Sequence, residues 1–188
     1  MSMNESWRWH QYEWTKSFSE QQIRDINDRI ESKYLDEVKD RGADWKNLSN
    51  VKIVAYSEIK SLLVPIVEHA YNIARYDFGY DVYPYDDEKT CNFNIYDSKD
   101  KADYAWHTDG CDLPFVDCKL TLIINLSTEP YEGGEFQLMQ SKEEQTIKTL
   151  GIPGGALMFK SHILHRVLPV TSGIRKTLTI FINGPRFR

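Results

Sequence analysis

The sequence predicts an α+β fold in which helices come first and a β-sandwich or barrel follows. The first part of the chain repeats apolar residues at helical spacing, whereas short β-type runs separated by turns begin near residue 78. A length of 188 residues fits a single domain with a sizeable core. We therefore expect one domain, 1–188, in which 1–77 are mainly helical support and 78–188 form the β core.

The first predicted helix begins at Ser19, which fits a capping box together with Gln22 three residues later. The apolar residues that follow recur at helical spacing with charged residues between them, and they are Ile23, Ile26 and Ile30. We expect this helix to reach the thirties and to extend toward Val38, with residues 41–44 as its stop.

A second helical region is predicted over about residues 57–74. Pro65 lies inside it, and a proline removes a backbone donor and clashes with the preceding turn. We therefore expect a kink or a break at Pro65, and two short helices are an equally good prediction.

The β half is predicted from short runs of residues bounded by turns. Glycine pairs mark turns at residues 132–135 and 153–155. The predicted strands cover residues 92–96, 119–126, 136–138, 145–149, 156–159 and 175–182. Several short strands at this spacing favour a β-sandwich or barrel.

Composition and charge argue against several classes of protein. The 28 acidic and 23 basic residues give a net charge of -5, which disfavours binding to nucleic-acid phosphates. Cys91, Cys111 and Cys118 lack CxxC or regular spacing, which indicates free thiols rather than a disulfide framework or zinc knuckle. No secretory signal pattern and no apolar run of membrane-spanning length is present, so we expect a cytoplasmic protein without membrane contact.

The first candidate site is the segment WHTDG, in which one residue separates His107 from Asp109. Side chains at i and i+2 of an extended chain point to the same face, so this imidazole and carboxylate can reach one point. A mixed nitrogen and oxygen pair suits Fe(II), Mn(II) or Zn(II). Taken alone, a histidine and an aspartate at this spacing are weak evidence for a metal site.

The second candidate is the pair His162 and His165, which follows a glycine turn and a short apolar strand. A histidine at this place would complete a three-ligand metal set. The alternative is a structural histidine at a strand end, and the segment taken alone favours that alternative.

The third candidate is the strand predicted over residues 175–182, whose side chains divide into two faces at a period of two. The face that should pack against the core carries Lys176, Leu178, Ile180 and Ile182, and the other carries Arg175, Thr177, Thr179 and Phe181. An inward guanidinium with a hydroxyl two residues on is a good receptor for a carboxylate. The alternative is an edge strand with Arg175 in solvent.

Considered together, these segments resemble the Fe(II)/2-oxoglutarate-dependent oxygenases, and specifically their prolyl 4-hydroxylase-like branch. The resemblance covers roughly residues 92–185 and keeps the family's order of segments. Tyr96 is followed by YAWHTD, TLIINL, EGGEF and PGGALMF. The order ends with the specific string HRVLPVTSGIR, which runs from His165 to Arg175.

The resemblance implies a double-stranded β-helix, or jelly roll, supported by helices and holding iron inside one end. The implied iron ligands are His107, Asp109 and His165, because the downstream motif aligns with His165 and not with His162. Arg175 would bind the C5 carboxylate of 2-oxoglutarate with help from the Thr177 hydroxyl. The family's pocket tyrosines match Tyr96 and Tyr104, whereas Asn125 stands where some members have another tyrosine.

The implied activity is hydroxylation of an unactivated C–H bond, with succinate and CO2 as coproducts, and Asp109 favours this reaction over halogenation. The substrate that the branch suggests is a prolyl residue in a peptide or protein, with a small molecule as the alternative. The implied cofactors are Fe(II), 2-oxoglutarate and O2, with ascorbate in addition. Candidate substrate loops cover residues 97–103 and 111–117, and the residues of a candidate aromatic groove are Tyr104, Trp106, Phe115 and Tyr131.

Two other functions stay open. One is a nucleic-acid oxidative demethylase of the same superfamily, in which Arg186 and Arg188 would supply an additional basic contact, although the net acidity disfavours this partner. The other is a non-catalytic jelly-roll binding module that holds a metal. Turnover of 2-oxoglutarate separates an enzyme from such a module.

Overall fold

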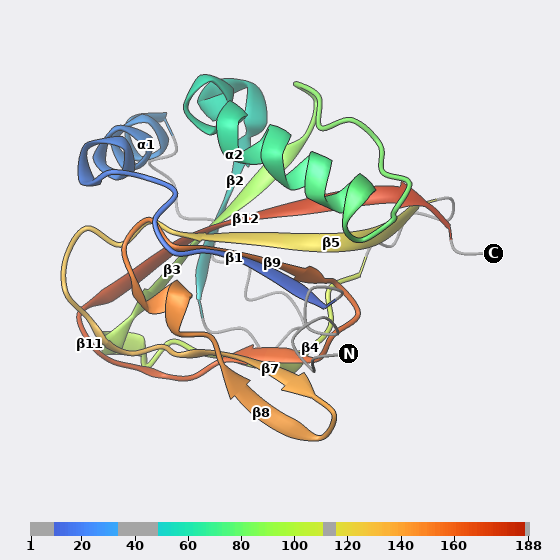
Figure 1. Ribbon diagram of the computed structural model, residues 1–188. Coiled ribbons are helices and arrows are strands. Elements are labelled where there is room, and N and C mark those ends of the chain that lie inside the picture. Colours follow the sequence, from blue (N-terminus) through green and yellow to red (C-terminus); the bar gives the residue numbers. More distant parts are fainter. Residues whose placement is uncertain (1–9, 34–48, 111–115, 187–188) are drawn as a thin grey trace.

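The computed structural model describes residues 10–33, 49–110 and 116–186. These residues form two long helices and three β-sheets (Figure 1). In chain order the elements are β1 (Gln11–Trp14), α1 (Glu20–Lys33), β2 (Asn50–Ala55), α2 (Tyr56–Tyr76), β3 (Thr90–Asp97), β4 (Tyr104–His107), β5 (Val116–Asn125), β6 (Glu132–Gly133), β7 (Phe136–Gln140), β8 (Glu143–Thr146), β9 (Ala156–Lys160), β10 (His165–Val167), β11 (Val170–Ser172) and β12 (Ile174–Pro185). Two short 3₁₀ helices, Ser98–Asp100 and Lys148–Gly151, lie between strands.

The elements are arranged in layers of helices, a large sheet and a small sheet. The large sheet has the strand order β1-β9-β5-β12-β3-β2, and each pair of neighbours is antiparallel. Helices α1 and α2 cover one of its faces, and the small sheet, β4-β10-β7-β8, lies on the opposite side (Figure 1). Two facing antiparallel sheets supported by helices confirm the predicted fold class.

The central strands of the large sheet are buried on both faces, and alternation sends their side chains into two different cores. On β5, Leu120, Leu122 and Ile124 belong to the core shared with the helices. Ile123 points the other way, into the core between the two sheets. On β12 the same rule places Leu178, Ile180 and Ile182 toward the helices. The opposite face of β12 is therefore free to carry polar side chains between the sheets.

The start of α1 confirms the predicted capping box. The Ser19 N–H donates to Gln22 Oε1 at 2.9 Å, and the Gln22 N–H donates to Ser19 Oγ at 3.3 Å. The residues that the helix buries in the core include the predicted Ile23, Ile26 and Ile30. The predicted extension toward Val38 and the stop at residues 41–44 lie outside the described residues.

The second helix, α2, is continuous through Pro65, so the prediction of a break there is wrong. Pro65 is exposed, whereas its neighbours Ile66 and Val67 are buried against the sheet. The carbonyl that loses its helical partner therefore lies where water can reach it, and the packed face holds the helix together across the proline. Among the described residues, no helix is both long and apolar enough to cross a membrane.

Two strands were missed in the N-terminal part of the chain, although helices make up most of its described residues. Strand β1 pairs with β9 at one edge of the large sheet, and β2 pairs with β3 at the other. Strand β1 has only four residues, too few to show a period. In the C-terminal half, the strand predicted over residues 145–149 is divided between β8 and the 3₁₀ helix Lys148–Gly151.

Candidate active site

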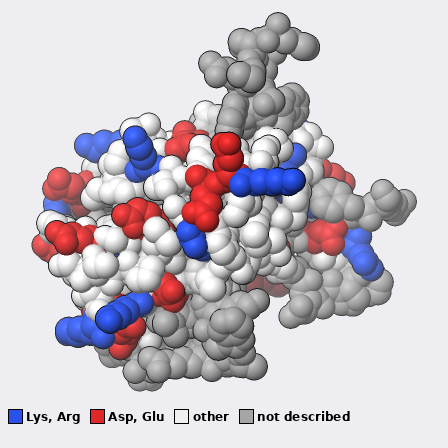
Figure 2. All heavy atoms as spheres, turned by 90° about the horizontal axis from the view of Figure 1, so that it is seen from below, with Lys and Arg blue, Asp and Glu red and all other residues white. Residues whose placement is uncertain are grey.

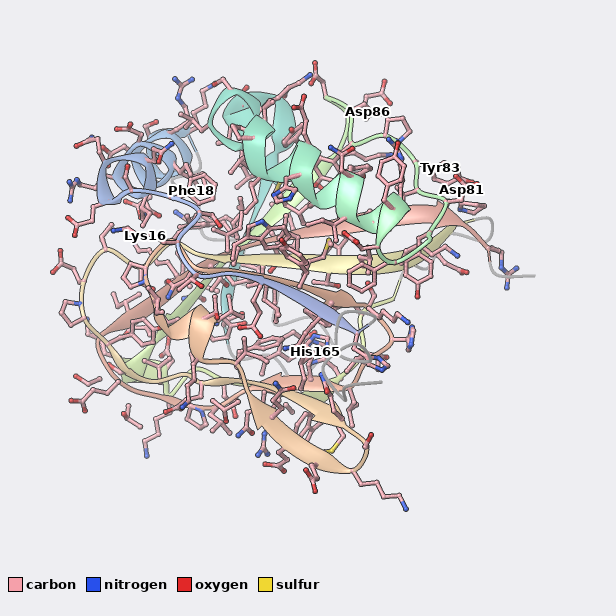
Figure 3. The ribbon with its side chains drawn as sticks, viewed as in Figure 1. Lys16, Phe18, Asp81, Tyr83, Asp86 and His165 are labelled. Carbon is pink, nitrogen blue, oxygen red and sulfur yellow. The ribbon has the colours of Figure 1, made fainter. Side chains whose placement is uncertain are left out.

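His107 and His165 lie opposite each other on β4 and β10, adjacent strands of the small sheet. Their ring centroids are 4.1 Å apart, and His165 lies between the two sheets (Figure 3). Each Nδ1 lies 2.8 Å from a backbone carbonyl two residues earlier, that of Ala105 for His107 and that of Ile163 for His165. An Nδ1–H that donates to a carbonyl leaves Nε2 with a lone pair, which is how histidines are prepared to bind a metal.

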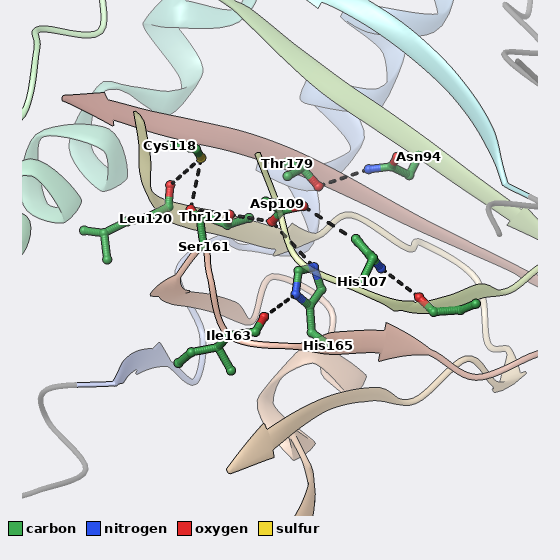
Figure 4. Close-up of polar contacts among 11 residues, drawn as sticks. Asn94, His107, Asp109, Cys118, Leu120, Thr121, Ser161, Ile163, His165 and Thr179 are labelled. Atoms are coloured by element: carbon green, nitrogen blue, oxygen red, sulfur yellow. Dashed lines mark hydrogen bonds and ion pairs between the residues drawn. The ribbon is translucent and has the colours of Figure 1, made fainter. Parts of the chain in front are cut away.

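Asp109 lies just beyond the end of β4 and meets both imidazoles. Its Oδ1 is 3.7 Å from His107 Nε2, and its Oδ2 is 3.5 Å from His165 Nε2 (Figure 4). The ligand atoms of these three residues all lie within 4.8 Å of one another. Two neutral nitrogens and one carboxylate oxygen at this separation match the donor set of a mononuclear Fe(II) site.

The Asp109 carboxylate is held in its charged form. Burial acts to raise its pKa, but the neighbouring His165 and His107 imidazoles and the hydrogen bond from Thr121 together lower the pKa below its ordinary value. An ionised carboxylate between two imidazoles is ready to accept a cation without first losing a proton.

Arg175 lies in the same cavity, which has a volume of about 100 Å³. Its side chain is 1% exposed, so the alternative of an edge strand with Arg175 in solvent is wrong: β12 is a central strand. Its Nε and Nη2 atoms are buried without a hydrogen-bond partner in the described part of the chain. A desolvated guanidinium that lacks an acceptor needs an anion, and the cavity offers the space for one.

The other predicted pocket residues surround Arg175 and the histidines. Thr177 is buried and lines the cavity two residues along β12. Tyr96 pairs with Arg175 across the β3–β12 ladder, and the guanidinium carbon lies 5.2 Å from the centre of its ring. Burial raises the pKa of the Tyr96 phenol, which therefore stays protonated. Tyr104 stacks on His107 with 3.5 Å between ring centroids.

The structure thus brings every predicted site residue to one cavity. The cavity is lined by Tyr96, Tyr104, His107, Asp109, His165, Arg175 and Thr177, together with other residues. His162 is exposed and does not line it, whereas His165 lies with His107 and Asp109, as the predicted assignment requires.

Asn125 and part of the predicted aromatic groove lie elsewhere. Asn125 is buried outside the cavity, where its amide donates to the Leu150 carbonyl at 2.9 Å and to the Tyr131 hydroxyl at 3.3 Å. The guanidinium carbon of Arg166 lies over the Trp106 ring, 4.5 Å from the ring centre. Trp106 and Tyr131 therefore do not form the predicted groove with Tyr104, and Phe115 lies outside the described residues, as does Arg188.

Several residues of the cavity were missed by the sequence analysis. Thr121 on β5, and Asn92 and Asn94 on β3, line it. Alternation along the predicted strands could have identified them. Each is a polar residue among apolar ones, at a position whose side chain points to the face between the two sheets.

Comparison with known proteins agrees with the chemistry of the cavity. Residues 91–183 match the family model described as the 2OG-Fe(II) oxygenase superfamily. Just under half of the chain is thus similar to the 2OG-Fe(II) oxygenases. The family name itself gives the expected metal and cosubstrate, and the matched segment contains each of the three converging ligand residues.

A curated relative of the chain is a PKHD-type hydroxylase of Synechococcus sp. (strain JA-2-3B'a(2-13)). It is 39% identical over 79 residues, which cover 38% of this chain and 34% of the relative. The match thus spans about a third of the length of that relative.

Solved structures share the fold of this protein over nearly the whole chain. A prolyl-4-hydroxylase of Pseudomonas putida superposes with a TM-score of 0.73 at 14% identity, covering 94% of each chain. A prolyl hydroxylase of Trichoplax adhaerens, in complex with a hypoxia inducible factor peptide fragment, has a TM-score of 0.74 at 14% identity, covering 95% of this chain and 86% of that one. At these identities the likeness shows the fold alone.

Proposed function

We propose that this protein is an Fe(II)- and 2-oxoglutarate-dependent dioxygenase that hydroxylates an unactivated C–H bond. The observation that carries the proposal is the sharing of one cavity by three converging metal-ligand atoms and a buried guanidinium without an acceptor. A structural metal site would explain the ligands but not the guanidinium. A cosubstrate that carries a carboxylate explains both.

The iron would be held by His107, Asp109 and His165. Their Nδ1 hydrogen bonds and the lowered pKa of Asp109 prepare all three for a divalent cation before it arrives. When bound, iron and 2-oxoglutarate activate O2 and supply one oxygen atom to a C–H bond, leaving succinate and CO2. We include ascorbate in the proposal as the reductant that keeps the iron ferrous.

The far carboxylate of 2-oxoglutarate would pair with Arg175. Thr177 lines the cavity beside it and would donate its hydroxyl to the same carboxylate. Tyr96 flanks the guanidinium, and Tyr104 covers His107, so both rings exclude water from the reacting end of the cavity. In this arrangement the residues of β12 and β3 orient the cosubstrate, while the small sheet supplies the histidines.

We further propose a prolyl residue in a peptide or protein as the substrate. The support is the PKHD-type hydroxylase relative and the two prolyl hydroxylases of the same fold.

We also propose that 1–188 form one domain, because β1 and β2 from the N-terminal part belong to the same sheet as β3. A cytoplasmic location belongs to the proposal too, since the buried Cys91 forms no disulfide in the described part of the chain.

The test is succinate formation by purified protein supplied with Fe(II), 2-oxoglutarate, ascorbate and a panel of proline-containing peptides. We expect peptide-dependent succinate from the parent protein and none from Asp109→Ala, which removes the carboxylate ligand. A folded parent protein that forms no succinate, with or without peptide, would contradict the proposal and favour a metal-holding binding module.

A nucleic-acid substrate is the alternative, and the same succinate assay with an oligonucleotide in place of the peptides tests it. Acidic and basic side chains are mixed on the face of the molecule seen from the side of the small sheet (Figure 2). Among the described residues, that face shows no basic stripe of the kind that a phosphate backbone requires. Turnover stimulated by a methylated oligonucleotide and not by peptides would replace the prolyl substrate.

A further inference from the structure

The three metal-ligand residues are not held in the same way. His107 and His165 belong to paired strands, so the ladder between β4 and β10 fixes their backbones. Asp109 belongs to residues 108–110, which are in no strand. Its backbone N–H donates instead to the Ser161 carbonyl at 2.9 Å, just after β9 of the large sheet. The carboxylate ligand is therefore anchored to the large sheet, across the sandwich from the histidines.

A chain of side-chain hydrogen bonds leads to the same carboxylate. Thr121 Oγ1 donates to Asp109 Oδ2 at 2.6 Å, and Ser161 Oγ lies 3.0 Å from Thr121 Oγ1. Cys118 Sγ lies 3.0 Å from Ser161 Oγ (Figure 4). Thr121 and Ser161 are 0% exposed, so water does not compete for these bonds.

The charge of Asp109 fixes the direction of this chain. An ionised carboxylate accepts hydrogen bonds only, so Thr121 uses its single proton on Asp109. Ser161 then donates to Thr121, and the single proton of the Cys118 thiol is shared between Ser161 Oγ at 3.0 Å and the Leu120 carbonyl at 3.8 Å. Each donor polarises the next, which strengthens the final bond to the carboxylate.

We propose that Thr121 and Ser161 are positioning residues that hold Asp109 in its metal-binding orientation, with Cys118 as the outermost member of the chain. The inference rests on the proposed function, since it assumes that the three ligand residues bind a divalent metal. The affinity of the site for the metal would then depend partly on Thr121 of β5 and on Ser161, the residue after β9, although neither residue is a metal ligand.

The test compares Thr121→Val, which keeps the shape of the side chain and removes its donor, with Thr121→Ser, which keeps the hydroxyl. Mn(II) serves as the probe, and its affinity is measured by calorimetry on the protein without 2-oxoglutarate. We expect Thr121→Val to weaken Mn(II) binding by about 10- to 100-fold, the usual effect of removing a group that orients a ligand. Thr121→Ser should bind Mn(II) close to the parent value.

A matched control is Thr149→Val. Thr149 is also a buried threonine whose hydroxyl donates to a carboxylate, that of Glu13, but it does not line the metal cavity. Its replacement should cost stability while leaving Mn(II) affinity unchanged. If Thr121→Val does not fold, Ser161→Ala removes the next donor, and we expect a smaller loss of Mn(II) affinity because the Thr121 bond remains.

The outcomes separate this inference from the proposed function. A parent protein that does not bind Mn(II) would overturn both. A parent that binds Mn(II), with Thr121→Val binding it equally well, would overturn the positioning role alone. The visible spectrum of bound Co(II) gives a second readout, since a displaced carboxylate changes the coordination in Thr121→Val and should not in Thr121→Ser or Thr149→Val.

Discussion

At the scale of single residues, Arg175 has the environment that is hardest to explain without a ligand. The guanidinium is buried, and two of its nitrogen atoms have no hydrogen-bond partner among the described residues. Leaving such a charge without an acceptor costs several kcal/mol, so a site that keeps it is adapted to bind an anion.

Gly134 gives a prediction about how Arg175 is placed. This glycine has φ +68°, and a Cβ at its position would lie 2.9 Å from Arg175 Cδ and 2.9 Å from Val170 Cγ2. We expect Gly134→Ala to displace the arginine and raise the KM for 2-oxoglutarate, with a stability loss of about 1–3 kcal/mol.

The control for that change is Gly151→Ala, because nothing lies within 4 Å of a Cβ built on Gly151. Steady-state kinetics in 2-oxoglutarate and thermal unfolding measure both effects. An unchanged KM in Gly134→Ala would show that the contact with Arg175 does not set the position of the guanidinium.

Cys91 gives a prediction about pH. Burial raises the pKa of its thiol to about 11 from an ordinary 9.0, although a hydrogen bond with Tyr85 opposes part of the rise. The folded state therefore holds this proton more tightly than the unfolded state. The stabilisation is complete below pH 9 and is lost as the pH rises toward 11, and the total loss is about 3 kcal/mol.

The measurement is the free energy of unfolding between pH 8 and pH 11 for the parent and Cys91→Ala. The variant has a cavity and is less stable throughout, but its stability should fall less steeply over this window. The pKa of Tyr56 is also raised, to about 12, mainly by burial and in part by Cys91, so Cys91→Ala reduces this second pH dependence slightly as well. Parallel curves would show that the Cys91 thiol is not what titrates.

The residues of the site differ in how readily the sequence reveals them. His107, Asp109, His165 and Arg175 were predictable because a short spacing or a resemblance links them. The role of Thr121 was not, because it depends on Asp109, which lies twelve residues away, just beyond the end of β4. Such pairings are set by the tertiary fold, which a local pattern does not encode.

At the scale of elements, alternation along the central strands explains most of the architecture. Strands β5 and β12 were predictable because burial on both faces requires long apolar runs. The edge strand β1 was not, since its stability comes from pairing with β9 and from a hydrogen bond of Trp14 Nε1 to His69 Nδ1 on α2, at 3.1 Å. Both contacts come from residues distant in sequence.

Helix α2 gives the prediction at this scale. Since Pro65 is exposed and the helix continues through it, Pro65→Ala should restore a backbone hydrogen bond without disturbing the packed face. We expect the free energy of unfolding to increase by about 1–3 kcal/mol. Chemical denaturation of the two proteins measures it, and a clear loss of stability would mean that the proline shapes the helix to fit the sheet.

At the scale of the whole molecule, the site joins the two sheets. The small sheet supplies the histidines, the large sheet supplies Arg175, and Asp109 is bonded across to Thr121 and Ser161. Ligands that bridge the two sheets should therefore stabilise the entire fold rather than one loop.

This predicts that Mn(II) and 2-oxoglutarate together raise the melting temperature, and that a chelator reverses the rise. Each ligand, at a concentration 100 times its dissociation constant, should increase the free energy of unfolding by about 3 kcal/mol. In Arg175→Ala the contribution of 2-oxoglutarate should disappear while that of Mn(II) remains. Stabilisation of the variant by 2-oxoglutarate as strong as in the parent would contradict the role of Arg175.

The central claim is that one cavity binds both iron and 2-oxoglutarate. Its most direct test is anaerobic addition of Fe(II) and 2-oxoglutarate to the apoprotein, followed by a search for the visible metal-to-ligand charge-transfer band. We predict a band in the parent protein, a weaker band in Arg175→Ala at the same 2-oxoglutarate concentration, and none in Asp109→Ala. The absence of a band in folded parent protein at saturating concentrations of both would contradict the account.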